Sequence, residues 1–215
     1  MYNQTDTRCD IWLTAAQAMT AQIPDTLLLQ ERTFSIVGVN GQGLFDPLDH
    51  DLRPFPRITS CWRGYVCEYK VHVNEFLLNK LQVNLGVNRE QGGISEEGPL
   101  IHGIEPVLAT STRDLFNNTY QELNVHMEFT GGILAADDFI QELYVHMGFH
   151  PAWKYKNVIE LIVSHGHVTE IRDVSGIMQE IRNRLVKSQL EPGLQASKEE
   201  IEKWVAATFK LDYRL

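Results

Sequence analysis

The chain has 215 residues, of which 43% are hydrophobic, and its formal net charge is −9. This length and hydrophobic content allow a proper core in one large or two small domains. The acidity argues against direct binding to nucleic acid, which requires a clustered Lys and Arg surface.

The first predicted elements are a short helix and a β-hairpin. A helix is expected over residues 10–22, because Trp12, Ala16, Met19 and Ile23 recur at helical spacing. The β-rich residues 34–39 then end in Asn40-Gly41. This dipeptide tolerates positive φ and is typical of a hairpin turn, so we expect the chain to reverse there.

A second hairpin is predicted after a long surface loop. Three prolines within residues 46–57 exclude regular strand pairing there. Residues 65–73 alternate between apolar and polar side chains, and Asn74-Glu75 turns this strand into an apolar one over residues 76–85. Residues 86–103 are rich in Gly, Glu and Asn, which is typical of a connection between structured parts.

A nearly exact internal repeat follows, with seven of nine positions shared. Residues 121–129 return as residues 141–149 at an offset of 20. With a period of two, one face of the first copy is apolar, and both copies are therefore predicted to be half-buried β-strands. We expect them to flank a strand over residues 133–136 in a three-stranded meander. The apolar face of the first copy comprises Leu123, Val125, Met127 and Phe129.

The remaining residues predict one more hairpin and two helices. Residues 158–163 and 168–172 are expected to pair around His165-Gly166. Ile177, Ile181 and Leu185 recur every four residues, which indicates a first helix. A capping box at Ser197 indicates a second helix over residues 197–208.

These elements predict an α+β fold that is mainly antiparallel β, built from meander hairpins in a sandwich-like or barrel-like arrangement. A short N-terminal helix and two C-terminal helices are expected to pack on the sheet. We expect a single domain over residues 1–215, with two related halves, 26–105 and 114–174, and a helical segment, 175–215. A continuous sandwich or barrel without duplication predicts the same strands, so both origins stay open.

The histidines raise the hypothesis of a metal site. His126 and His146 occupy equivalent positions of the repeat, with Glu122, Glu128 and Glu142 as neighbouring carboxylates. If residues 133–136 form a strand between the copies, the two histidines stand about 10 Å apart and are poorly placed to share an ion. We therefore assign no metal and no cofactor, and interpret these side chains as a solvated face.

A second hypothesis concerns residues 61–65, which combine unusual residue types at the entry to a strand. Arg63 could favour a thiolate at Cys61, and His50 or His102 could act as the base of a Cys/His nucleophile. The structural alternative places Trp62 in the core and pairs Arg63 with a carboxylate. No pattern fixes a base beside the cysteine, so we assign no catalytic residue.

The function that these observations favour is that of a non-catalytic, acidic protein-binding module with a basic protein partner. Bacterial immunity, antitoxin or accessory proteins have this size and acidity. The alternative is an enzyme or small-ligand binder that uses residues 61–65 and nearby His and Asp side chains. The candidate binding residues are Trp62, Arg63, Glu122, His126, Glu142 and His146.

A cytoplasmic location without a membrane anchor is also expected. No apolar segment approaches the roughly 20 residues that span a bilayer, and no secretion signal is recognisable at the N-terminus. Three cysteines cannot all pair, which favours a reducing compartment. The sequence leaves the oligomeric state open.

Overall fold

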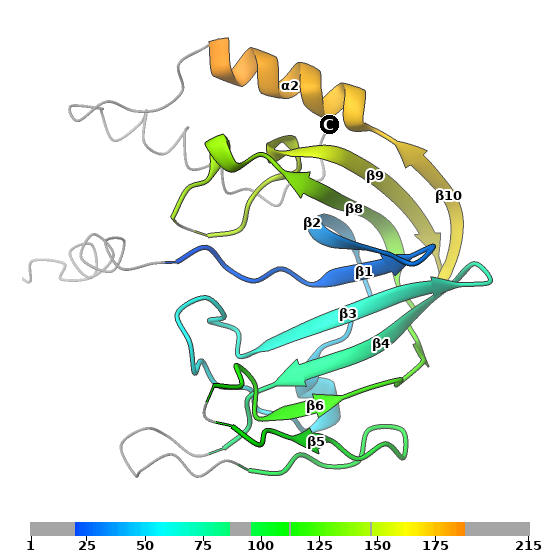
Figure 1. The fold of residues 1–215 in the computed structure, drawn as a ribbon. Helices are drawn as coiled ribbons and strands as arrows, with labels where there is room; N and C mark the ends of the chain where they lie inside the picture. The colour runs from blue at the N-terminus through cyan, green and yellow to red at the C-terminus, as the bar shows by residue number, and fades with distance from the viewer. Residues whose placement is uncertain (1–19, 87–95, 112, 147, 188–215) are drawn as a thin grey trace, which may run out of the picture.

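The computed structural model describes residues 20–86, 96–111, 113–146 and 148–187 (Figure 1). Ten strands form one sheet, and seven of them close into a barrel. Around the barrel the order is β10-β9-β8-β2-β1-β3-β4, and the pairing of β4 with β10 closes it. All neighbours are antiparallel except β1 and β3. The barrel strands are β1 (Thr26–Leu29), β2 (Arg32–Gln42), β3 (Tyr65–His72), β4 (Glu75–Val83), β8 (Thr130–Phe139), β9 (Tyr155–Ser164) and β10 (His167–Asp173).

Strand β4 changes partner along its second edge. At its start Glu75 lies opposite His167 of β10, and at its end Leu81 lies opposite Tyr120. Between these two ends, the middle of β4 pairs with β7 (Val125–His126). The end of β4 pairs with β6 (Asn118–Tyr120). Strand β5 (Val107–Leu108) pairs only with β6 and forms the outer edge of this branch (Figure 1).

Large side chains fill the inside of the barrel. Tyr69, Phe76 and Phe129 are all buried. The rings of Tyr69 and Phe76 stack with centroids 5.0 Å apart, and Phe129 lies 5.9 Å from Phe76. The Tyr69 hydroxyl accepts a hydrogen bond from the backbone N–H of Phe45 at 3.2 Å. The barrel interior is therefore a packed core.

A smaller cluster lies outside the barrel, where α2 (Ser175–Lys187) covers β8 and β9 (Figure 1). Met178 packs there with Leu134, Ala136 and Val158. Arg182 holds the helix against the start of β9 and the segment before it, because its guanidinium donates hydrogen bonds to the carbonyl oxygens of Trp153 and Tyr155. None of the helices in the described residues is long and apolar enough to span a membrane.

The predicted α+β fold class is wrong, because the protein is mostly β and its sheet closes on itself. Barrel closure buries the apolar face of the sheet without a layer of helices, and α2 is the only α-helix in the described residues. It corresponds to the first predicted C-terminal helix. The second, over residues 197–208, lies outside the described residues, as does the predicted N-terminal helix apart from residues 20–22, which are not helical.

Two of the three predicted hairpins are confirmed. The β3–β4 and β9–β10 pairs turn at Asn74 and at His165-Gly166, where φ is positive. The hairpin at Asn40-Gly41 is wrong, since β2 continues through both residues and pairs with β8. The chain reverses earlier, at Gln30-Glu31, with φ values of 49° and 63°.

The two repeat copies adopt different structures, so the predicted meander is also wrong. In the first copy only β7 is a strand, although Leu123, Met127 and Phe129 are buried in the core as expected. The second copy begins with a short 3₁₀ helix (Gln141–Leu143) and continues without a strand in its described residues. The first copy pairs with β4 through β7, and the described residues of the second copy have no such pairing.

Replacing Gly41 with Ala is expected to destabilise the barrel. A Cβ at this position would lie 2.4 Å from the Thr130 carbonyl oxygen and 2.7 Å from the Phe129 ring. We expect a loss of about 1–3 kcal/mol in the free energy of unfolding, measured by urea denaturation. Gly176→Ala is the matched control, because no atom lies within 4 Å of a Cβ there. Equal stability of the two variants would contradict close strand packing at Gly41.

Candidate functional site

Three side chains from three strands meet where the barrel closes. Glu75 begins β4, His126 ends β7 and His167 begins β10. Their ligand atoms all lie within 4.8 Å of one another, and the two imidazole centroids are 5.5 Å apart. We call these three residues the seam cluster.

Strand register explains why these residues share a face. Glu75 lies opposite His167, and Leu77 lies opposite His126. Residues opposite each other in antiparallel strands point to the same side, as do residues two apart in one strand. Phe76 and Leu78 belong to the barrel core, so the seam cluster faces outward. Barrel closure thus assembles the cluster.

Two neighbours shape the position of the His126 ring. A Cβ on Gly166 would lie 2.2 Å from Cε1 of His126, so the ring packs where only glycine leaves room. On its other side, Nδ1 of His126 is 3.6 Å from Oε1 of Glu128. A carboxylate beside Nδ1 favours a proton on that nitrogen and leaves Nε2 as the available lone pair.

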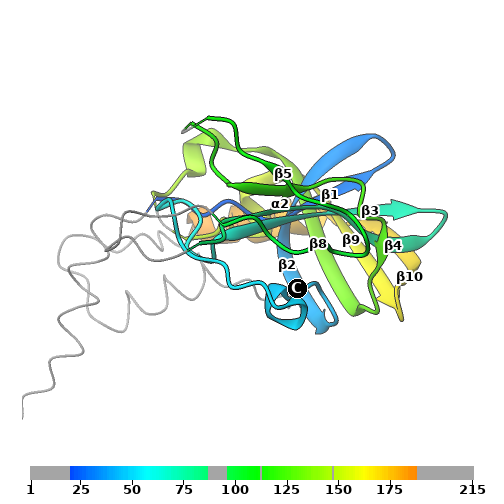
Figure 2. The ribbon, with the colours of Figure 1, turned by 90° about the horizontal axis from the view of Figure 1, so that it is seen from below.

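The other end of β4 borders an open groove of about 480 Å³. Its walls come from β3, β4, β5 and β6, and they combine apolar with polar side chains. Seen from below in Figure 2, β5 lies on the near side of the molecule. Val107, Leu108 and Leu115 line the groove and are 59%, 43% and 50% exposed.

The residues around Cys61 form a partly buried polar cluster, the Cys61 corner, whose apolar neighbours Val66 and Phe116 also line this groove. Asp25 accepts two hydrogen bonds from Arg63, at 2.7 and 2.6 Å, and one from the backbone N–H of Cys67 at 2.6 Å. Burial acts to lower the pKa of Arg63, but Asp25 outweighs it and raises this pKa above its ordinary value. The guanidinium also lies 4.8 Å from the ring centroid of Tyr65. Arg63 is therefore engaged within the fold.

Cys61 sits in a setting that favours the neutral thiol. Burial raises the pKa of Cys61 even though Arg63 acts to lower it. The thiol donates to the Tyr65 carbonyl oxygen at 3.3 Å. His50 stacks on Phe45 and lies 6.3 Å from His102, centroid to centroid. Within the described residues, no hydrogen bond or ring contact joins either histidine to Cys61.

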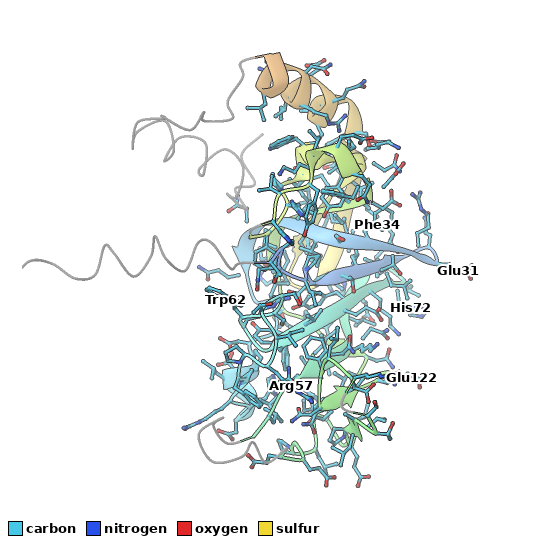
Figure 3. All side chains as sticks on the ribbon, turned by 60° about the vertical axis from the view of Figure 1, so that its left-hand side comes forward. Glu31, Phe34, Arg57, Trp62, His72 and Glu122 are labelled. Carbon is cyan, nitrogen blue, oxygen red and sulfur yellow. The ribbon has the colours of Figure 1, made fainter. Side chains whose placement is uncertain are left out.

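The other sequence-predicted binding residues are dispersed. Trp62 is 46% exposed and lies on the left in Figure 3, whereas His72 and Glu122 lie on the right. Glu142 is exposed in its 3₁₀ helix, and His146 bonds to the Tyr144 hydroxyl at 3.0 Å. The structure thus brings His126 together with Glu75 and His167, and no described contact joins it to His146.

Sequence reasoning missed an aromatic cluster around His150. Its ring lies 4.7 Å from Phe139 and 5.3 Å from Tyr144, between centroids. Both ring nitrogens are buried without a hydrogen-bond partner in the described structure. Burial, with a smaller contribution from Lys154, lowers the pKa of His150 to about 4.

Comparison with known proteins finds no matching family model, no matching curated protein and no matching solved structure. The seam cluster, the groove and the Cys61 corner are the features of this chain that bear on its function.

The thiols of Cys61 and Cys67 are expected to be inert in the folded protein. Burial raises both pKa values, and both side chains are buried. In a Cys9→Ser background, modification by a thiol reagent at pH 8 should be at least about tenfold slower in buffer than in urea. Adding Cys61→Ser to this background shows which of the modification rates belongs to Cys61 and which to Cys67. Fast reaction of Cys61 in the folded protein would revive the nucleophile hypothesis.

Acid is expected to weaken the packing around His150. The pKa of His150 is about 4 in the folded chain and near 6.5 when unfolded, so the unfolded state binds more protons between these values. The stability that neutral His150 contributes is present above pH 6.5 and declines as the pH falls towards 4. From pH 7 to pH 5 the free energy of unfolding of the native protein should therefore fall relative to that of His150→Phe, which cannot take up this proton.

Urea denaturation at pH 7, 6 and 5 measures this difference. His146→Ala is the matched control, because His146 is also a histidine, is exposed and lies close to His150 in the sequence. A pH-independent difference for His150→Phe would show that folding does not lower the pKa of this imidazole.

Proposed function

We propose that this protein is a non-catalytic protein-binding module that binds an extended, basic segment of a partner protein along the free edge of β5. The observation that carries this proposal is an unpaired edge strand with exposed apolar side chains beside a groove. Edge strands of this kind pair readily with another chain, and proteins normally protect them with charge, proline or a covering segment.

The backbone of β5 supports the addition of a strand. The N–H of Ala109 donates to the Asn117 carbonyl oxygen at 3.0 Å, so Ala109 faces β6. In antiparallel pairing, hydrogen-bonding direction alternates along the strand, and the backbone groups of Leu108 therefore point away from β6. Among the described strands, none lies on that side. Leu108 can thus offer one donor and one acceptor to an added strand.

Side chains along this edge supply an apolar contact. Val107, Leu108 and Leu115 are all large, and each is at least 43% exposed. The groove continues inward to Val66 and Phe116, which pack with Cys61 in a small core cluster. Trp62, the residue after Cys61, adds an exposed ring near this cluster. Apolar surface that remains exposed in one region is typical of an interaction site.

Charge around the edge favours a basic partner. Glu96, Glu97 and Glu105 are exposed. Asp114 also lines the groove, and Lys80 is the one Lys or Arg among the described lining residues. The carbonyl of Glu96 accepts from Asn118 of β6, which places this acidic segment beside the branch. With a net charge of −9, these carboxylates would attract Lys and Arg side chains flanking an apolar segment.

Size and acidity support placement among bacterial immunity, antitoxin or accessory proteins, which act by occupying another protein. The buried, unpaired thiols of Cys61 and Cys67 support a reducing cytoplasm. A small ligand in the same groove, held near the Cys61 corner, is the alternative function. The two differ because a small ligand needs the groove side chains and not the outward backbone N–H of Leu108.

Site-specific crosslinking tests the proposed surface. A photoreactive residue at Val107 should capture the partner, whereas one at Ile171, which is 45% exposed on β10, should not. The captured protein is then identified and its basic segment synthesised for direct binding measurements. A crosslink from both positions, a crosslink only to a second copy of this chain, or a strictly solitary chain in its native lysate would contradict the proposal.

Leu108→Pro should weaken partner binding at least about tenfold, because proline lacks the donor that an added strand requires. Leu108→Thr is the matched control for lost apolar contact, since it keeps the N–H. Affinity for the identified segment is measured by calorimetry at low and at high salt, and screening should weaken it. Equal affinity of the proline and threonine variants would argue against strand addition and favour the groove alone.

A further inference from the structure

We propose that the seam cluster, Glu75, His126 and His167, is a binding site for a divalent transition-metal ion such as Zn²⁺. This inference is independent of the partner-binding edge, which lies at the other end of β4. It concerns a different surface and needs no partner.

The donor set determines the class of ion. Two imidazoles and one carboxylate suit zinc and its neighbours among the first-row divalent metals, whereas calcium and magnesium prefer sites made wholly of oxygen. Three protein ligands leave a further position of a tetrahedral ion for water. His167 is exposed, so solvent can reach this position.

The distances are close to those of a bound site. Zinc bonds of about 2.0–2.1 Å place the ligand atoms of a tetrahedral site roughly 3.3 Å apart. The ligand atoms of the seam cluster lie within 4.8 Å of one another. A bound ion would draw the Glu75 and His167 side chains toward the His126 ring, which packs against Gly166.

Backbone hydrogen bonds hold the three strands in this arrangement. The N–H of Phe76 donates to Gly166 at 2.8 Å, and the N–H of Gly166 donates to Phe129 at 2.9 Å. Val168 donates to Asn74 at 2.7 Å, and Met127 donates to Phe76 at 3.0 Å. Each ligand is adjacent in sequence to a residue in this set. The site is therefore built on fixed backbone and does not depend on a loop.

Glu128 completes the site from outside. Its carboxylate lies 3.6 Å from Nδ1 of His126. In metal sites, a ligating histidine commonly gives its other N–H to a carboxylate, which sets the ring orientation and raises the basicity of the ligating nitrogen. Glu128 is therefore a positioning residue, while His126 binds the ion through Nε2.

A bound ion would link β4, β7 and β10 at the point where the barrel closes. Because the ligands come together only in the folded chain, metal binding should stabilise that state. With free Zn²⁺ at about 100 times its dissociation constant, the midpoint of thermal unfolding should rise by about 5–10 °C.

The test uses the full chain without a histidine tag, carrying Cys9→Ser and freed of metal by chelation. Calorimetry should show one Zn²⁺ per chain, and Glu75→Gln, His126→Ala and His167→Ala should each weaken binding at least about tenfold. His146→Ala, the repeat counterpart of His126, is the control and should change affinity less than twofold. Glu128→Gln should weaken binding without abolishing it.

A second measurement does not depend on variants that fold. In NMR spectra of the native chain, Zn²⁺ should shift the imidazole signals of His126 and His167 and leave those of His146 in place. Binding that survives Glu75→Gln and His126→Ala unchanged, or shifts confined to other histidines, would overturn the proposal. The absence of any shift or heat at millimolar Zn²⁺ in the folded protein would overturn it as well.

Discussion

Closure of the barrel at the seam between β4 and β10 is the constraint on which the rest of the structure depends. Only Glu75 and His167 lie opposite each other there, and backbone bonds around Gly166 join the seam to β4 and to Phe129. A closed sheet has no free edge at this point and encloses its apolar face completely. Residues such as Tyr69, Phe76 and Phe129 can therefore share one core with strands from both ends of the chain.

Closure also explains why β4 has two different ends. A barrel strand has two neighbours, yet the second edge of β4 meets β10, β7 and β6 in turn. The chain must therefore leave the barrel surface where β6 and β5 branch away. At the first end, convergence of strands concentrates polar side chains on the outer face. At the second end, divergence of the sheet opens a groove and exposes an unpaired strand.

Electrostatics separates the residues that support the fold from those available to a ligand. Asp25 neutralises Arg63 and also binds the backbone of β3 at Cys67, so this pair anchors the start of the strand. The same burial keeps the thiols protonated and removes them as nucleophiles. Glu75, His126 and His167 are in a different situation, because their ligand atoms converge on a face that solvent reaches.

Much of the local structure could be predicted from the sequence. Alternating and apolar runs on either side of turn residues indicated the β3–β4 and β9–β10 hairpins. Asn74, His165 and Gly166 adopt positive φ at these turns. The burial of Leu123, Met127 and Phe129 followed from the same period of two. The hairpin predicted at Asn40-Gly41 was wrong, because a glycine that allows a turn also allows two strands to approach closely. Here Gly41 packs against β8.

The sequence by itself determined the alternating faces, two turns and the amphipathic helix α2, since these follow from neighbouring residues. Only the tertiary structure decided which hairpin meets which. The repeat contains the short strand β7, paired with β4, in its first copy and a 3₁₀ helix in its second copy. The first copy alone pairs with β4 among the described residues. The seam cluster has the same origin: its residues are separated by 51 and 41 positions in the chain, and barrel closure places them within 4.8 Å.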